Sequence, residues 1–121
     1  IKTFLVKNNI KFPLAKILLL GLAYKKNIDD YRESASLELF NLLNKKKIKK
    51  IKFYDPYFKK DNVPKGINLL TKLTSKNLLE FDLVILVTDH DNFDYNFIKK
   101  NAKKIIDCRG RFPLSDKVIR G

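Results

Sequence analysis

The most constraining feature of this sequence is the short segment 16–21 (KILLLG), in which an unbroken apolar run follows Lys16 and ends in glycine. A second run, residues 83–87 (LVILV), has the same character. Continuous apolar runs of this length are typical of strands buried on both faces, as in the middle of a parallel sheet. Both runs are far shorter than the ~20 residues needed to span a bilayer. The sequence therefore predicts a protein built around a parallel sheet and not a membrane protein.

Helical and strand patterns alternate along the rest of the chain. Ser34 opens a helix with one buried stripe, and Asp55-Pro56 closes a strand over 51–54. A strand, a helix and a strand in this order predict a right-handed βαβ unit. The remaining expected elements are a short strand at 67–70, helices at 75–80 and 94–101, and a last strand at 104–107. The fold class predicted is α/β, a Rossmann-like three-layer sandwich with a mainly parallel sheet.

The domain organisation follows from the length of 121 residues, which suits one domain. Residues 1–12 are predicted to be the tail of a preceding linker helix that Pro13 stops. The chain is therefore expected to be a piece of a longer protein, with one domain over 13–121.

The formal net charge of +13 points at first to nucleic acid. However, 22 of the 26 basic residues are lysines, and they occur in helix ends, strand starts and loops throughout the chain. Base recognition favours arginine, which is scarce here. Most of the charge is therefore predicted to be solvated surface, and a non-enzymatic, nucleic-acid-binding module is kept as an alternative.

The sequence has one cysteine, Cys108, and one histidine, His90. A single cysteine cannot form an internal disulfide, and the two residues together cannot make a zinc site. We therefore expect no metal centre and a reducing, cytoplasmic location. An enzyme that uses Cys108 as its nucleophile on the same fold remains a third hypothesis.

Three polar segments follow predicted strands, where ligands bind in sheets of this kind. They are residues 24–34, 88–93 and 107–111. The first combines cations with a helix N-terminus, which suits an anion, although it also fits a solvated loop. In the second, a histidine between two aspartates lacks a nucleophile, and capping is the alternative. In the third, guanidinium groups suit phosphate or carbonyl recognition, and surface solvation or pairing with a nearby carboxylate is the alternative.

The glycine-rich dinucleotide loop is missing after the first strand. The sequence there is GLAYK (residues 21–25), and not G-x-G-x-x-G. The domain is therefore predicted to be Rossmann-like without a dinucleotide loop of its own.

Five short motifs occur in one order along the chain. They resemble the C-terminal domain of the UDP-glucose/GDP-mannose dehydrogenase family over residues 16–112. The motifs are GLAYK (21–25), DDYRES (29–34), YDPY (54–57), TDHD (88–91) and DCRG (107–110).

The resemblance implies a larger enzyme in which this is the UDP-sugar-binding C-terminal domain. In that family an N-terminal domain binds NAD, and a central domain carries the catalytic cysteine and makes a homodimer or larger assembly. Two NAD molecules oxidise C6 of the sugar to a carboxylate through a cysteine thioester. The resemblance therefore implies that this fragment has no catalytic residue and is inactive alone, and that Cys108 is not the nucleophile.

The resemblance also assigns residue roles. Lys25 and Arg109, with the backbone of Tyr24, are expected to bind the nucleotide sugar, and Arg32 is expected to reach NAD. Asp55 is expected to be mainly structural.

The substrate expected from the resemblance is UDP-N-acetylglucosamine, because residues 89–95 (DHDNFDY) are most similar to that branch. The product would be a uronic acid for polysaccharide synthesis. UDP-glucose and UDP-N-acetylmannosamine are the alternatives.

Overall fold

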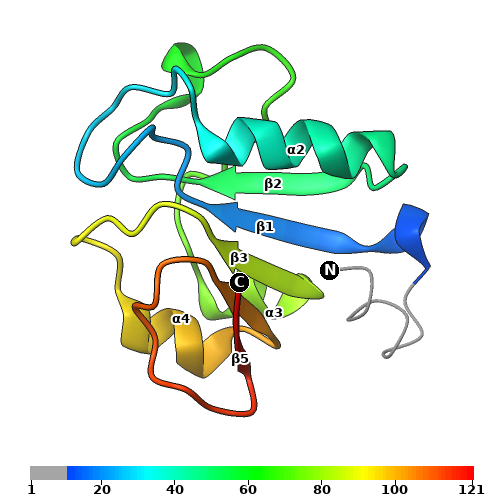
Figure 1. Ribbon diagram of the computed structural model, residues 1–121, viewed down its shortest axis with the longest axis vertical. Coiled ribbons are helices and arrows are strands. Elements are labelled where there is room, and N and C mark those ends of the chain that lie inside the picture. The colour runs from blue at the N-terminus through cyan, green and yellow to red at the C-terminus, as the bar shows by residue number, and fades with distance from the viewer. Residues whose placement is uncertain (1–10) are drawn as a thin grey trace.

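The computed structural model describes residues 11–121 as one twisted sheet with helices on both faces (Figure 1). The strand order is β2-β1-β3-β4-β5, and all four neighbouring pairs are parallel. The strands are β1 (Lys16–Leu20), β2 (Lys50–Tyr54), β3 (Leu83–Leu86), β4 (Ile105–Asp107) and β5 (Val118–Arg120). The helices are α2 (Ala35–Lys45), α3 (Ser75–Glu80) and α4 (Tyr95–Asn101), with 3₁₀ turns at η1 (Phe12–Leu14) and η2 (Lys60–Asn62).

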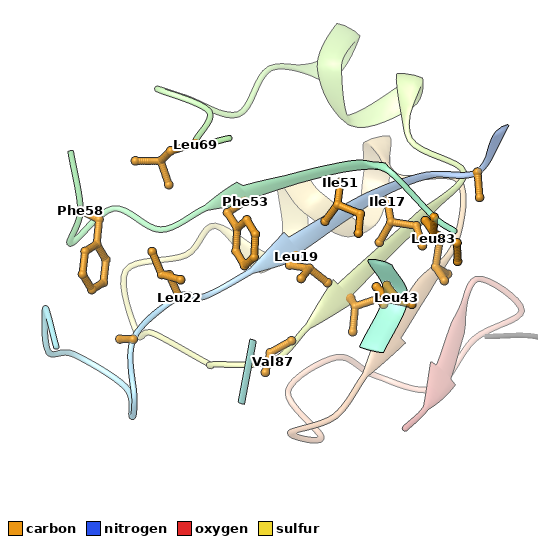
Figure 2. Packing of buried hydrophobic residues seen from close by; sticks show 14 residues of the cluster. Ile17, Leu19, Leu22, Leu43, Ile51, Phe53, Phe58, Leu69, Leu83 and Val87 are labelled. Atoms are coloured by element: carbon orange, nitrogen blue, oxygen red, sulfur yellow. The ribbon is translucent and has the colours of Figure 1, made fainter. Parts of the chain in front are cut away.

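The strand side chains alternate between two hydrophobic clusters, one on each face. Ile17 and Leu19 of β1 join the cluster that α2 covers, together with Ile51 and Phe53 of β2 (Figure 2). The other cluster lies on the face that α3 and α4 cover (Figure 1), and its buried members include Leu18, Leu20, Leu78, Val84, Leu86, Ile98, Ile105 and Phe112. The predicted three-layer, Rossmann-like α/β fold is confirmed.

Helix α2 begins and ends where local chemistry favours it. The hydroxyl of Ser34 accepts a hydrogen bond from the Leu37 N–H, which makes Ser34 the N-cap. At the other end, Lys47 adopts a φ of 68°, in the left-handed region that follows many helices. The hydroxyl of Ser36 also donates to the carbonyl oxygen of Gly21, which fixes the start of α2 against the end of β1.

The expected strands and helices lie within about a residue of the observed ones. The expected strand at 67–70 is reduced to a single parallel bridge between Leu69 and Phe53. The linker helix expected over 1–12 falls mainly on residues 1–10, which lie outside the described residues. Within residues 11–121, no helix is both long and apolar enough to cross a membrane.

The prediction that 104–107 is the last strand is wrong, because β5 follows it and pairs in parallel with β4. The connection between them, residues 108–117, contains no helix. Phe112 from this connection is buried in the cluster on the α3 and α4 face. It takes the place of the apolar side chains that a crossover helix would supply there. β5 is only three residues long and buries only Val118, so its sequence carries little strand signal.

Candidate functional site

The carboxyl ends of β1 and β3 lie next to each other in the middle of the sheet. From β1 the chain runs to β2 on one side, and from β3 it runs to β4 on the other. Such a reversal of strand order opens a crevice where ligands bind in open α/β sheets. The loops over 21–34 and 87–94 flank this point, and the loop after β4 lies beside them.

Tyr24 and Lys25 lie in the loop between β1 and α2, and both are exposed. The Tyr24 N–H donates to the carbonyl oxygen of Asp30 at 2.6 Å, which closes the loop on itself. Within residues 11–121, no hydrogen bond or ion pair engages the Lys25 ammonium group. An anion could therefore bind this ammonium group without breaking an internal contact.

Arg32 lies at the far end of the same loop and pairs with Asp30. The two side chains approach to 2.7 Å, and 84% of the Arg32 side chain is exposed. The hydrogen bonds from Arg32 lower the pKa of Asp30 to about 2. An exposed ion pair of this kind adds little to stability, so the guanidinium can exchange partners at small cost.

Asp55 follows β2 directly and is buried, with 2% of its surface exposed. Its Oδ2 accepts hydrogen bonds from the N–H groups of Leu22 at 2.7 Å and Ala23 at 3.1 Å. Its Oδ1 accepts from the Tyr57 N–H at 2.9 Å. The carboxylate thus ties the end of β1 to the end of β2, which confirms the structural role expected for Asp55.

His90 is fully buried between the loops. Its Nδ1 accepts the N–H of Asn27 at 2.7 Å, and its Nε2 lies 2.8 Å from Oδ2 of Asp55. Because Nδ1 is an acceptor, the proton of the neutral ring is on Nε2, which donates to the carboxylate. The rings of Tyr57 and Phe93 pack against it, with centroids at 4.6 and 5.4 Å. His90 therefore connects the loops and has no open coordination position.

Asn27 and Asp91 join the same two loops at the surface. The Asn27 amide donates to Oδ2 of Asp91 at 2.8 Å, and its Oδ1 accepts the Asp91 N–H at 3.0 Å. The amide of Asn27, followed by Arg111, lowers the pKa of Asp91. Asn27 has a φ of 63°, which asparagine tolerates better than most residues.

Asp89 is shared by two arginines of the loop after β4. Nε of Arg109 lies 3.2 Å from one carboxylate oxygen, and Nη1 of Arg111 lies 3.2 Å from the other. Arg111 also reaches Asp91 at 3.2 Å and stacks over the Tyr95 ring at 4.5 Å. Arg109 is the more exposed of the two arginines: 51% of its side chain is exposed, against 31% of the Arg111 side chain.

Asp107 shapes the backbone of this loop. Its Oδ1 accepts the N–H groups of Arg109 at 2.9 Å and Gly110 at 2.7 Å. Its Oδ2 accepts the Phe112 N–H at 2.8 Å and pairs with Arg120 at 3.2 Å. The buried carboxylate thereby sets where Arg109 leaves the sheet.

Cys108 is an exposed residue whose sulfur is only partly covered, and this partial burial, followed by the charge of Asp107, raises the pKa of its thiol. A raised pKa disfavours the reactive thiolate, which speaks against Cys108 as a nucleophile. In the described part of the chain, no group of three His, Cys, Asp or Glu side chains could hold a metal ion.

The structure brings three of the predicted site residues to one edge of the sheet. A polar chain runs from Arg109 through Asp89, Arg111 and Asp91 to Asn27. Asn27 is two residues from Lys25, so the arginine loop and the Tyr24 loop are physically connected. Arg32 lies apart from this chain, on its own pair with Asp30. Sequence reasoning assigned no role to Asn27 or Asp89, although Asn27 lies in the polar segment 24–34 and Asp89 lies within the TDHD motif.

A cleft of about 200 Å³ lies at the opposite edge, near the starts of β1 and β2. Lysines dominate its lining, but it is far from the strand ends that position the loops above. The lining residues are Lys16, Lys49, Lys50, Ile51, Lys52, Asn68, Glu80 and Phe81.

The sequence model for the UDP binding domain of the UDP-glucose/GDP-mannose dehydrogenase family matches residues 18–113. The chain belongs to this family. The match contains the whole switch-point edge, from the end of β1 to the loop after β4, and it confirms the resemblance found from the five motifs.

The individual relatives that match this chain carry the names of dehydrogenases. UDP-N-acetyl-D-mannosamine dehydrogenase from Pyrococcus horikoshii is 31% identical over 112 residues, which are 88% of this chain and 24% of the relative. NDP-N-acetyl-D-galactosaminuronic acid dehydrogenase from Ralstonia nicotianae is 28% identical over 83% of this chain and 24% of its own. The chain thus spans about a quarter of the length of these relatives.

Solved structures place the fold in the same family. The UDP-D-ManNAc dehydrogenase of Pyrococcus horikoshii superimposes with a TM-score of 0.70 at 28% identity, covering 97% of this chain and 28% of that one. The UDP-N-acetyl-mannosamine dehydrogenase Cap5O from Staphylococcus aureus gives 0.66 at 25% identity, covering 98% and 27%. This chain therefore has the same Rossmann-like fold as a domain of these UDP-sugar dehydrogenases.

Proposed function

We propose that this domain binds the uridine diphosphate part of a nucleotide sugar in an NAD-dependent nucleotide-sugar 6-dehydrogenase. Lys25, Arg109 and the backbone of Tyr24 contact the nucleotide sugar. The observation that carries this proposal is the placement of Lys25 and Arg109 at one switch-point edge, within the matched family segment.

Charge at this edge supports a diphosphate ligand. Arg109 and Arg111 pair with Asp89 and Asp91, and Lys25 and Lys26 lie on the loop that Asn27 connects to Asp91. The exposed Lys25 ammonium group and the half-exposed Arg109 guanidinium are the cations that a diphosphate could reach at this edge. Arg109 would exchange its long contact with Asp89 for a phosphate oxygen, while Arg111 keeps the carboxylate neutralised.

The cofactor assignment rests on the family. NAD would be bound mainly by a domain outside this chain, and Arg32 would reach it across the interdomain cleft. The exposure of its guanidinium and its weak surface pair are consistent with that role. NAD would supply the hydride acceptor, while the residues of this domain bind and orient the sugar nucleotide.

The domain would act as one part of a larger chain. Residues 13–121 would form the nucleotide-sugar domain, residues 1–12 would end the linker before it, and the complete enzyme would be a cytoplasmic homodimer or higher oligomer. Alone, the 121-residue chain would bind UDP and leave NAD unreduced, because it has neither the family's NAD loop nor its nucleophile.

The sugar would be an N-acetylhexosamine. The relatives from Pyrococcus and Ralstonia carry names of enzymes for N-acetyl-D-mannosamine and N-acetyl-D-galactosaminuronic acid. UDP-N-acetylglucosamine, expected from residues 89–95, is the first of this class to test.

Calorimetric titration of the 121-residue chain with UDP and UDP-N-acetylglucosamine tests the proposal. Lys25→Ala and Arg109→Ala should each weaken binding about ten- to hundredfold, since a hydrogen bond to a charged group contributes about 1.5–3 kcal/mol. Lys45→Ala, at the far end of α2, is the matched control and should leave the affinity unchanged. No UDP binding by the wild type, or equal affinity in all variants, would contradict the site.

Filter binding with single- and double-stranded DNA at rising salt tests the remaining alternative. A nucleic-acid module would bind tightly with a steep salt dependence, and its binding would survive Lys25→Ala and Arg109→Ala. We expect weak binding that UDP does not displace.

A further inference from the structure

We propose that Asp55 and His90 form a buried bracket that positions Tyr24 and Lys25 for the ligand. The Ala23 N–H bonds to Oδ2 of Asp55, the same oxygen contacts Nε2 of His90, and Nδ1 of His90 accepts the Asn27 N–H. This inference rests on the proposed function, because it names what holds the proposed UDP-binding loop. His90 is here a positioning residue that does not touch the ligand.

The bracket holds the backbone on both sides of a short exposed segment. Residues 24–26 are all exposed, whereas Ala23 before them is buried. The two backbone N–H groups that flank the segment, those of Ala23 and Asn27, end on the same pair of side chains. The distance between the two anchor points is therefore set by Asp55 and His90. Between them, the Tyr24 N–H is held by the Asp30 carbonyl oxygen at 2.6 Å.

The bracket itself cannot move easily. Both side chains have 0% exposure, so water does not compete for these hydrogen bonds. The His90 ring is packed between Tyr57 and Phe93, and the Tyr95 hydroxyl donates to the His90 carbonyl oxygen at 2.6 Å. The neutral ring with its proton on Nε2 satisfies both neighbours at once.

One proton position makes the bracket work. The Asn27 N–H needs a lone pair on Nδ1, and the Asp55 carboxylate needs a proton on Nε2. The other neutral tautomer would point Nδ1–H at the Asn27 N–H and leave Nε2 facing a carboxylate oxygen. The carboxylate therefore selects the tautomer that holds the ligand loop, as it does for the histidines of many functional sites.

Two substitutions separate the halves of the bracket. His90→Asn keeps an oxygen near the position of Nδ1 and loses the contact with Asp55. His90→Gln reaches Asp55 with its amide but offers no acceptor to Asn27. Thr88→Val is the matched control, because it removes a hydrogen bond of 2.9 Å to the Ala23 carbonyl and leaves both bracketed N–H groups in place.

The experiment reads out loop order and ligand affinity separately on the 121-residue chain. Amide hydrogen exchange at Asn27 reports the bracket without any ligand, and titration with UDP reports the site. The chain has one histidine, so a long-range ¹H–¹⁵N spectrum shows a single imidazole, and it should show the proton on Nε2.

In His90→Gln, we expect the Asn27 amide to lose its protection from hydrogen exchange and the affinity for UDP to fall about tenfold. His90→Asn, which keeps the acceptor for Asn27 but loses the contact with Asp55, should lose part of the protection and about threefold in UDP affinity, and Thr88→Val should bind within twofold. Unchanged UDP affinity in folded His90→Gln would overturn the inference, as would equal losses in both His90 variants. If the wild type binds no UDP, the proposed function fails. Asn27 exchange in the variants then still decides whether the bracket exists.

Discussion

Asp55 and Asp107 are buried carboxylates at the carboxyl ends of two strands, β2 and β4, and both accept backbone N–H groups. The donors to Asp107 lie two, three and five residues further along, with Arg120 as the distant partner. Asp55 binds Leu22 and Ala23, 33 and 32 residues away. The Arg109 loop is therefore shaped largely by its own sequence, whereas the Lys25 loop is shaped by a residue on another strand.

This difference divides the proposed ligand site into two parts. The Arg109 side consists of a local turn and ion pairs that water reaches. The Lys25 side depends on a buried network that exists only when β1, β2 and β3 are assembled. Loss of tertiary structure should therefore affect the Lys25 side first. Each prediction below tests that contrast, beginning with the largest effect.

Asp55→Ala should destabilise the domain more than Asp107→Ala does. Removing Asp55 leaves the Leu22, Ala23 and His90 donors unpaired in the interior, at a cost of about 3–5 kcal/mol. Asp107→Ala should cost about 2 kcal/mol, because water can reach the amides of Arg109 and Gly110 and only the Phe112 amide is left without a partner in the interior. Urea unfolding at neutral pH measures both. Equal losses, or a larger loss at Asp107, would show that the distant network is no more important than the local turn.

The glycines of the two loops offer a second test. Gly21 and Gly110 both have positive φ, 93° and 76°. A Cβ on Gly21 would lie 2.5 Å from Cβ of Thr88 and 2.7 Å from its backbone, whereas a Cβ on Gly110 would meet only the tip of Arg120 at 3.0 Å. Gly21→Ala should therefore cost about 3 kcal/mol, from backbone strain and overpacking, and Gly110→Ala about 1 kcal/mol.

Gly66→Ala is the control for this pair. It has a φ of 85° and nothing within 4 Å of its added Cβ, so it measures the strain of the backbone alone. In thermal unfolding, the Gly66→Ala and Gly110→Ala variants should have similar melting temperatures, and Gly21→Ala should melt well below both. A Gly21 variant as stable as the Gly66 variant would mean that the β1 and β3 loops are not in close contact.

The same contrast explains what the sequence could predict. Apolar runs, helix caps and the strand–helix order are local signals, and they predicted β1 to β4 and the three helices. β5 was missed because its three residues are held by pairing with β4 and not by a pattern of their own. The five motifs marked the loops of the proposed site: four begin at or just after the end of a strand, and DDYRES lies between β1 and α2.

The internal contacts of the site could not be predicted in this way. From sequence, the segment around His90 fitted helix capping or a histidine without a partner nucleophile. Only the fold places the two ring nitrogens of His90 between Asn27 and Asp55. The pairing of Arg109 with a carboxylate was an open alternative from sequence, and the structure identifies that carboxylate as Asp89, 20 residues away. Such contacts depend on strand order and on loop paths. These are properties of the whole folded chain and leave no local pattern in the sequence.

The smallest expected effect concerns the surface pair on the Lys25 loop. Asp30→Asn keeps an oxygen for the Arg32 N–H but removes the charge that its guanidinium binds. Because Arg32 lowers the pKa of Asp30 from 3.8 to about 2, the pair stabilises the wild type above pH 4, and this contribution is lost as the pH falls toward 2. The wild type and Asp30→Asn should therefore differ slightly at neutral pH and converge near pH 2.

A double-mutant cycle with Arg32→Gln, measured by urea unfolding at both pH values, isolates this coupling. The coupling should be smaller than the loss at Gly110 and should shrink further in high salt, because both groups are in solvent. A coupling that matched the loss at Asp55 would show that the exposed end of the loop is held by the ion pair. In that case the bracket of Asp55 and His90 would not be what fixes the loop.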